Sequence, residues 1–437
     1  MMKLLFYCLF LILLIFDWWV FLLGFMFITL FFFLCNYNYF YCNLSYSYGM
    51  DMISYWMIFL TLWIIILMIM SSYSIKLNSM NSMEFLLIIL MMYFFLFLCF
   101  SCSSLFNFYL WFESSIIPIL FLIFGWGYQP ERLSAGMYLI FYTLFGSFPL
   151  LLCIFYIEML CMTNFYFLIN IDFNFYIYLS MVLAFLFKMP MFFFHFWLPK
   201  AHVEAPVSGS MILAGVLLKL GGYGLYRVFI FMYIYIDYNY IWISISMLGS
   251  FIIGILCLCQ VDIKSMIAYS SISHMGLVIG GIMTCNIYGF WGSFIMMLGH
   301  GLCSSGLFSL SNMIYERTHS RSILINKGLL CFMPSLSMFW FLLSANNMSS
   351  PPSLNLLGEV MLINSLMSWS NITMIFLGLS SFFSCAYSIY LYSITQHGLM
   401  YSGIKFESYG NIREYYILIF HWLPLNTLFL KCDMLFL

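Results

Sequence analysis

The sequence contains very little charge. Only 7% of its 437 residues are Asp, Glu, Lys or Arg, against about 25% in an ordinary soluble domain. This shortage excludes a soluble enzyme, a disordered chain, a coiled coil and a nucleic-acid-binding protein. Apolar residues make up 65% of the chain, and the mean hydropathy is +1.05. Both values indicate a polytopic membrane protein.

The sequence also lacks the short alternating segments from which outer-membrane barrels are built. Its apolar runs are continuous, as in residues 85–100, and a helix needs about 20 such residues to cross a bilayer. The expected class is therefore an all-α polytopic membrane protein. The first apolar stretch continues past Leu30 without a small-residue cleavage site, so we expect retained helices rather than a signal peptide.

Motifs for cofactors are missing as well. No Gly-rich phosphate loop, nucleotide fingerprint, flavin motif or iron–sulfur cysteine set occurs. Cys99 and Cys102 form one CxxC pair within an apolar span, and no second pair accompanies it. We interpret them as small apolar residues rather than a metal or redox site. No cofactor and no metal are expected in this chain.

Alanine and valine are scarce, at 8 and 9 residues, whereas the chain has 51 Phe, 35 Met and 33 Tyr. Helix propensity does not favour Phe over Ala. AT-biased coding in an organellar genome is consistent with this usage.

Polar breaks and turn residues divide the chain into about fourteen apolar spans. The first two are close enough to form one long helix instead. The twelfth is too long for one passage and contains Pro351 and Pro352, which predict a break within the membrane. The expected spans are 3–16, 18–36, 52–72, 84–102, 104–125, 135–157, 175–198, 207–230, 239–259, 265–285, 288–313, 328–366, 371–394 and 414–430.

Positive charge is distributed unevenly between the connectors. Nine Lys or Arg residues follow odd-numbered spans and three lie on the opposite side. The first group is Lys76, Arg132, Lys200, Lys264, Arg317, Arg321, Lys327, Lys405 and Arg413, and the second is Lys3, Arg227 and Lys431. By the positive-inside rule, the odd connectors would face the matrix of a mitochondrion and both termini the intermembrane space.

Four charged residues lie well inside expected spans, away from their ends: Glu113, Lys188, Lys219 and Glu359. Each costs about 2.5–3.5 kcal/mol at a helix centre, so these side chains must pair, contact water or lose their charge. One interpretation is structural ion pairs between helices. The other, which we favour, is an ion or proton path. Glycines beside Lys219 let neighbouring helices approach it closely.

Two of the four charges lie next to prolines that interrupt a span. Lys188 precedes Pro190, and Glu359 follows Pro351 and Pro352. Interrupted helices at corresponding positions are typical of inverted-repeat transporters. Spans 4–8 and 9–13 would then be two inverted five-helix repeats with broken seventh and twelfth helices. The expected domains are residues 1–83, 84–235, 236–395 and 396–437, the last being a loop and a fourteenth helix.

His274 and His300 lie inside the tenth and eleventh spans. Histidine titrates near neutrality and can relay protons. A hydrogen-bonded structural role is the alternative for each, and a haem pair is disfavoured. His195 and His202 lie at or beyond the end of a span, where they could admit protons.

Several long motifs resemble a known family. They are Trp111-Phe-Glu113-Ser-Ser-Ile-Ile-Pro118, Lys188-Met-Pro190, His195-Phe-Trp-Leu-Pro-Lys-Ala-His202-Val-Glu-Ala-Pro206, Leu213-Ala-Gly-Val-Leu-Leu-Lys219, Tyr269-Ser-Ser-Ile-Ser-His274-Met-Gly, Gly299-His300-Gly, Tyr315-Glu-Arg-Thr-His-Ser-Arg321 and Pro351-Pro-Ser-Leu-Asn-Leu-Leu-Gly-Glu359. From about residue 84 to its end, the chain resembles the subunit 4 family of mitochondrial NADH:ubiquinone oxidoreductase, respiratory complex I. Its members are antiporter-like membrane-arm subunits.

The resemblance implies a proton-translocating core subunit of complex I in the mitochondrial inner membrane. NADH, FMN, iron–sulfur clusters and ubiquinone would be bound by other subunits. The implied partners are neighbouring antiporter-like subunits, accessory subunits and lipids such as cardiolipin, with no nucleic acid.

The resemblance also implies roles for individual residues. The family's ionisable positions on its fifth, seventh and eighth helices correspond to Glu113, Lys188 and Lys219, and the position on its twelfth helix corresponds to Glu359. Protons would pass along them with the help of His300 and His274. A stand-alone secondary cation/proton antiporter is the alternative function, and a passive scaffold is a third.

Overall fold

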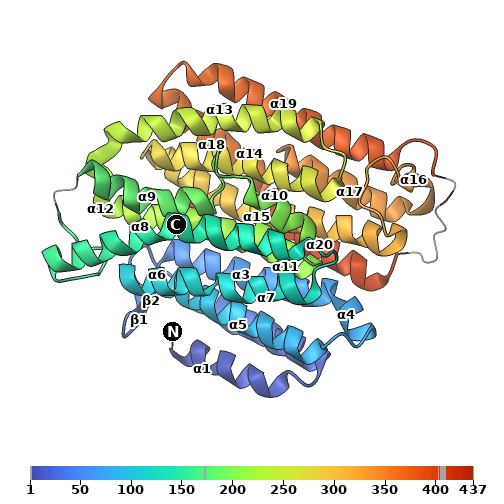
Figure 1. The fold of residues 1–437 in the computed structure, drawn as a ribbon, viewed down its shortest axis with the longest axis horizontal. Coiled ribbons are helices and arrows are strands. Elements are labelled where there is room, and N and C mark those ends of the chain that lie inside the picture. Colours follow the sequence, from blue (N-terminus) through green and yellow to red (C-terminus); the bar gives the residue numbers. More distant parts are fainter. Residues whose placement is uncertain (1, 172–173, 402, 404–409, 437) are drawn as a thin grey trace. The chain divides into compact units, whose positions relative to one another are not determined.

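The computed structural model describes residues 2–171, 174–401, 403 and 410–436, so that Lys405 lies outside the described part. The regular structure is almost entirely helical (Figure 1), as expected where lipid offers the backbone no hydrogen bonds. Nine helices in the described part are long and apolar enough to cross a membrane. They span Met52–Ser71, Ser82–Ser101, Leu105–Trp126, Arg132–Cys161, Val207–Met232, Tyr235–Leu258, Ile263–Met283, Ile287–Thr318 and Thr373–Gln396.

The chain divides into two compact units. The first comprises Met1–Lys188 and Glu204–Tyr235, and the second comprises Met189–Val203 and Ile236–Phe436. The boundary between the two units at Tyr235 falls within the short helix η3 (Tyr233–Tyr238).

In the first unit, α3 contacts α2, α5 and α11, and α9 contacts α8 and α12. A Cβ atom at Gly224 would overlap the ring of Phe185, and one at Gly146 would lie 2.7 Å from the ring of Phe187. These glycines therefore let α12 and α8 approach α9 closely, which fixes the position of Lys188 at its end. The helices of this unit are α1 (Met2–Phe10), η1 (Leu11–Leu14), α2 (Trp18–Phe33), α3 (Met52–Ser71), α4 (Tyr73–Leu77), α5 (Ser82–Ser101), α6 (Leu105–Ser114), α7 (Ile116–Trp126), α8 (Arg132–Cys161), α9 (Phe175–Lys188), α11 (Val207–Ile212), the π-helical turn η2 (Leu213–Leu217) and α12 (Leu218–Met232).

The beginning of the chain forms two helices rather than one long helix. Asp17 has an extended backbone (φ −114°) between η1 and α2 and ends the first helical stretch. A small antiparallel hairpin follows α2, with strands β1 (Cys42–Ser45) and β2 (Tyr48–Met50). The expectation of a purely helical chain did not include this hairpin, because its strands are too short to give a hydropathy pattern.

In the second unit, α15 contacts α14, α17, α18 and α20, so it lies at the centre of this unit. A Cβ atom at Gly358 would lie 2.9 Å from the backbone nitrogen of Met296, which shows how closely α18 approaches α15. Helix α13 runs beside α14 and α19 (Figure 1). The helices are α10 (Trp197–Glu204, with Glu204 in the first unit), α13 (Asn239–Leu258), α14 (Ile263–Met283), α15 (Ile287–Thr318), α16 (Leu329–Phe332), α17 (Pro334–Asn347), α18 (Leu354–Trp369), α19 (Thr373–Gln396), α20 (Ile412–Leu430) and α21 (Asp433–Phe436).

Prolines lie at the two breaks in the helical path that the sequence predicts, whereas Pro149 and Pro424 lie within α8 and α20. Helix α9 ends at Lys188, and Pro190 lies in the non-helical segment before α10. Helices α17 and α18 are separated by a segment that contains Pro351 and Pro352. A proline cannot donate the backbone hydrogen bond that continues a helix.

Candidate functional site

Lys188 is the last residue of α9 and is buried. Its Nζ donates a hydrogen bond of 2.7 Å to the carbonyl oxygen of Phe112 on α6. The same Nζ lies 3.1 Å from the centroid of the Phe112 ring, at the distance of a cation–π contact. One aromatic residue thus provides both a backbone acceptor and a ring face for the ammonium group.

Glu113 follows Phe112 on α6 and interacts electrostatically with Lys188. Within the described part, no direct ion pair joins the two side chains. The Oε1 atom of Glu113 is buried and has no hydrogen-bond partner there. The structure therefore places the acid and the base as neighbours, with the carbonyl of Phe112 as the direct partner of Lys188.

Lys219 is the second residue of α12, which follows the π-helical turn η2, and it is fully buried. Its Nζ donates a hydrogen bond to the carbonyl oxygen of Ala214, which lies within that turn. Single π-helical turns inside α-helices are frequent at functional sites because they distort the regular backbone ladder. Both predicted lysines of the first unit are thus held by backbone carbonyl oxygens.

A second pair of charges in the first unit was not predicted. Arg227 was placed on a connector by the charge count, but it lies inside α12 and is buried. Its guanidinium donates two hydrogen bonds to the carboxylate of Asp51, at 2.7 and 2.6 Å. Asp51 also caps α3 in a reciprocal capping box with Ser54. No local sequence pattern predicts this contact, because it joins residues 176 positions apart.

Asp51 lies just before the membrane-spanning part of α3, and its pKa is lowered overall. Burial is the largest single effect on this pKa and raises it, because a buried carboxylate loses its hydration. The opposing charge and hydrogen bonds of Arg227 outweigh it, together with the hydrogen bonds from Ser54. The Asp51 carboxylate is therefore charged at neutral pH.

The three predicted residues of the second unit come together between α14, α15 and α18. Nδ1 of His274 lies 3.3 Å from Oε1 of Glu359, at ion-pair distance but without the alignment of a hydrogen bond. The rings of His274 and His300 have centroids 5.5 Å apart. Both histidines are buried, whereas the side chain of Glu359 is 13% exposed. Titratable groups from three helices thus form one cluster.

A fourth helix contributes a residue that the sequence reasoning missed. The hydroxyl group of Tyr387 on α19 lies 3.2 Å from Nε2 of His274 and 3.1 Å from Oγ of Ser273. Tyr387 is buried, with Ser384 and Ser388 among the other buried residues of its helix. One tyrosine among 33 carries no sequence signal of its own, so only the fold identifies it.

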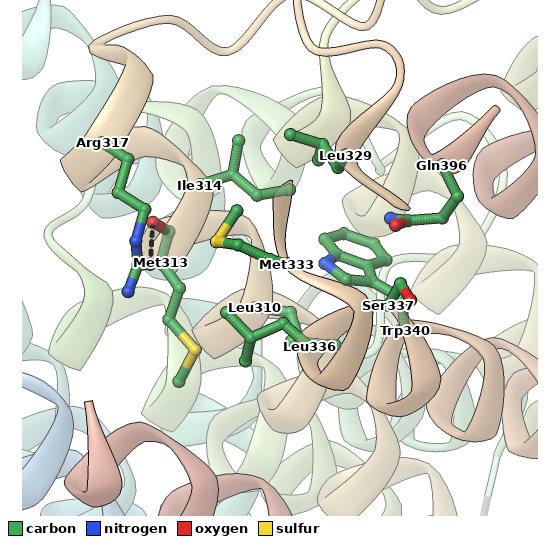
Figure 2. A pocket seen from close by; sticks show the side chains of 10 residues that line it. All are labelled: Leu310, Met313, Ile314, Arg317, Leu329, Met333, Leu336, Ser337, Trp340 and Gln396. Carbon is green, nitrogen blue, oxygen red and sulfur yellow. Dashed lines mark hydrogen bonds between the residues drawn. The ribbon is translucent and has the colours of Figure 1, made fainter. Parts of the chain in front are cut away.

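Two small cavities lie within the second unit. The first has room for about one water molecule, with a volume of ≈ 10 Å³, and lies beside Tyr387, Ser270, Ser344 and Ser388. The second has the same volume and is lined mainly by apolar residues, with Arg317, Ser337 and Gln396 as polar groups (Figure 2). None of the six predicted site residues lines either cavity.

Arg317, which lines the second cavity, takes part in contacts within and between helices. Figure 2 marks the hydrogen bond of Arg317 to the carbonyl oxygen of Met313, at 2.7 Å. Arg317 also forms an ion pair of 2.5 Å with Glu414 on α20. This cavity therefore adjoins a buried ion pair between α15 and α20.

The other two predicted histidines pack against aromatic rings. The His195 ring stacks on Phe192 with centroids 5.6 Å apart, and the His202 ring stacks on Phe308 at 4.6 Å. In the described residues, no group of three His, Cys, Asp or Glu side chains could hold a metal ion.

Two family profiles match the chain. One, described as NADH:quinone oxidoreductase/Mrp antiporter, TM, matches residues 102–384, and the other, NADH-ubiquinone oxidoreductase chain 4, amino terminus, matches residues 1–99. NADH-ubiquinone oxidoreductase chain 4 of Ceratitis capitata is 61% identical over 333 residues, which are 76% of this chain and 75% of that protein. The chain belongs to the NADH-ubiquinone oxidoreductase chain 4 family. The amino-terminal match includes the first eighty residues, where the motifs gave no resemblance.

Further comparisons extend the same likeness. The chain 4 protein of Aedes aegypti is 58% identical over 335 residues, covering 74% of each chain. The fold is similar to a chain of respiratory complex I from Thermus thermophilus with bound NADH. That match has a TM-score of 0.86 and covers 97% of this chain and 94% of the other, at 22% sequence identity. The two chains therefore share the same fold.

Proposed function

We propose that this chain is a core subunit of the membrane arm of NADH:ubiquinone oxidoreductase and that it translocates protons. Electron transfer from NADH to ubiquinone in other subunits would drive this transport. The observation that carries the proposal is the cluster of His274, Glu359 and His300 from three helices of the second unit, with 3.3 Å between the nearest acid and base atoms. Ionisable groups buried in membrane-spanning helices typically mark ion or proton paths.

The proposed path begins in the first unit. Glu113 stabilises the charged form of Lys188, and a change in that interaction releases a proton toward Lys219. The carbonyl acceptors support this role, because a neutral amine donates to a carbonyl as an ammonium does. A lysine that loses its proton there keeps its hydrogen bond to the carbonyl oxygen.

The path continues through the second unit, by way of His300 and His274 to Glu359. A histidine beside a carboxylate can take up and release a proton near neutral pH. Since Nδ1 of His274 lies 3.3 Å from Glu359, protonation of the ring would strengthen their attraction. This acid–base pair is the part of the proposal with the most direct geometric support.

The finer architecture belongs to the same proposal. We infer fourteen transmembrane helices, with inverted five-helix repeats at residues 84–235 and 236–395. Residues 1–83 would precede them, and residues 396–437 would supply a loop and the last helix. The interruptions after Lys188 and before Leu354 support the assignment of broken seventh and twelfth helices.

The setting of the chain follows from its family. We place it in the mitochondrial inner membrane, with both termini toward the intermembrane space, as the nine-to-three distribution of positive charge predicts. Neighbouring antiporter-like subunits, accessory subunits and lipids such as cardiolipin would contact it. NADH, FMN, iron–sulfur clusters and ubiquinone would be bound by other subunits.

The test is proton pumping by the intact complex in sealed vesicles, with NADH oxidation followed in parallel. Lys219→Ala and Glu113→Ala should abolish or strongly reduce pumping in a complex that still assembles. Lys76→Ala is the matched control, because Lys76 lies in the short helix α4 outside the proposed path. Pumping at the native ratio in both path variants would refute the path, and the charges would then be structural.

The same preparation distinguishes the alternative function. A stand-alone cation/proton antiporter would purify without flavin or iron–sulfur subunits and would exchange cations in the absence of NADH. We expect the chain to co-purify with those subunits.

A further inference from the structure

The hydroxyl group of Tyr387 has two polar neighbours. It lies 3.2 Å from Nε2 of His274 and 3.1 Å from Oγ of Ser273. The other ring nitrogen of His274 faces Glu359. Both nitrogens of this histidine therefore face a protein group that can respond to its charge.

The hydrogen atoms in this cluster can be counted. The hydroxyl group of Ser273 donates to the carbonyl oxygen of Ser270 at 2.8 Å, so toward Tyr387 its oxygen offers only lone pairs. A phenol has one hydrogen and can also accept. Tyr387 therefore has a single hydrogen to share between two acceptors, Ser273 and His274.

The two charge states of His274 require different arrangements of that hydrogen. When His274 is neutral and Nε2 carries a lone pair, the Tyr387 hydroxyl donates to Nε2. When His274 is protonated, Nε2–H donates to the Tyr387 oxygen, and the hydroxyl hydrogen turns to Ser273. Each arrangement gives Nε2 of His274 and the Tyr387 hydroxyl group a hydrogen-bond partner without movement of a heavy atom, which matters because a buried polar atom left without a partner is costly.

The surroundings allow the hydroxyl group to turn. A cavity of ≈ 10 Å³ lies beside the Tyr387 side chain, between α14, α15, α17 and α19. The other titratable groups that face the His274–Tyr387 pair come from four helices. They are Glu359 on α18, His300 on α15, Cys257 on α13 and Cys385 on α19. Among these groups, Tyr387 alone contacts Nε2 of His274 by a hydrogen bond in the described structure.

We propose that Tyr387 is a positioning residue of the proton path, whose hydroxyl group turns between His274 and Ser273 and so stabilises both the neutral and the protonated ring. The proposal rests on the proposed function, because it acts through His274. It adds α19 to the helices that take part in transport, and it gives Ser273 a role as the acceptor used only when His274 is charged.

The test uses the intact complex in sealed vesicles. Tyr387→Phe removes the hydroxyl group and preserves the ring packing. We expect the pumping rate coupled to NADH oxidation to fall about tenfold, because hydrogen bonds to a charged group contribute that much or more to an equilibrium. Tyr390→Phe, one turn further along α19, is the matched control and should leave the rate unchanged.

Two further variants separate positioning from packing. Ser273→Ala should reduce pumping less than Tyr387→Phe, because only the protonated state loses its acceptor. In the double variant Tyr387→Phe with His274→Gln, the rate should equal that of His274→Gln alone, since the tyrosine acts through the histidine. A purely structural tyrosine would give additive losses instead.

The outcomes distinguish this inference from the proposed function. If Lys219→Ala abolishes pumping but Tyr387→Phe pumps at the native rate, the inference is wrong and the proposed function stands. If neither variant affects pumping, the proposed function itself fails. If Tyr387→Phe prevents assembly, Ser273→Ala decides the matter, and native pumping by that variant would overturn the inference.

Discussion

The buried pair of Asp51 and Arg227 leads to a quantitative prediction. Replacing Arg227 by Met removes the guanidinium group but keeps most of the side-chain volume. Asp51 then loses both hydrogen bonds, of 2.7 and 2.6 Å, while its side chain remains in a site where it is only 10% exposed. Removing one partner of a buried ion pair costs about 3–5 kcal/mol, since the remaining charge is left without compensation.

The double variant sharpens this prediction. Asp51→Asn with Arg227→Met removes both charges and keeps a side-chain oxygen that can cap α3. Because no uncompensated charge is left, the double variant should be more stable than Arg227→Met alone. Asp51→Asn alone should be damaging, since it leaves a buried guanidinium without its carboxylate.

The assay is limited proteolysis of the purified complex, with cleavage in the β1–β2 hairpin followed over time, and the thermal midpoint of NADH oxidation measured alongside. Arg227→Met should expose the hairpin to cleavage and lower the midpoint, and the double variant should recover part of both losses. If Arg227→Met behaves like the native complex, or if the double variant is less stable than Arg227→Met, the electrostatic reasoning is wrong.

Three other predictions concern pH, packing and the cluster around Glu359. The pKa of Asp51 is lowered from 3.8, so its stabilising contribution is present above that value and lost as the pH falls through the folded pKa. In Arg227→Met, only the hydrogen bonds from Ser54 still oppose burial, so the pKa of Asp51 rises and hairpin cleavage by an acid-active protease should begin at higher pH than in the native complex. Gly224→Ala should reduce the amount of assembled complex on native gels, with a cost of about 1–3 kcal/mol for overlap with Phe185, whereas Gly378→Ala, which has open space, should not. Glu359→Gln should abolish pumping in vesicles, and retention of the native proton ratio would contradict its role.

Hydropathy predicted the positions of the helices well. Every one of the nine long helices falls on an expected span, because lipid imposes one length and one hydrogen-bonding pattern on any crossing segment. The expectation was less complete where that constraint is absent. The hairpin at Cys42–Met50 lies between helices and was missed, and hydropathy left open whether the first two spans were separate.

The candidate site was predictable to the extent that charge is rare. Glu113, Lys188, Lys219 and Glu359 were conspicuous because so few charges occur in the spans, and the structure places all four in helices. Arg227 escaped notice because it lies near the end of a span, where an arginine usually reaches the aqueous phase. Its partner Asp51 is distant in the sequence, so no local pattern could predict their contact.

The partners of the site residues were the least predictable part. The sequence indicated that Lys188, which lies within a span, needs a partner, and that partner is the carbonyl oxygen of Phe112. A backbone carbonyl group is the same in every residue, so the sequence cannot show which one accepts a hydrogen bond. Tyr387 could not be predicted for another reason. Its role depends on the packing of α19 against α14, and one tyrosine among 33 forms no sequence pattern.

The anchoring of both buried lysines to carbonyl oxygens has a consequence for genetics. No substitution of the Phe112 or Ala214 side chain deletes those acceptors, because every amino acid carries the same carbonyl group. A mutational scan would therefore detect a loss of function at the two lysines but could not remove the carbonyl oxygens of Phe112 and Ala214, which accept their hydrogen bonds. Evolution can change those contacts only through mutations that move a helix. In related sequences such mutations would be insertions or changes to glycine or proline, rather than substitutions at positions 112 and 214.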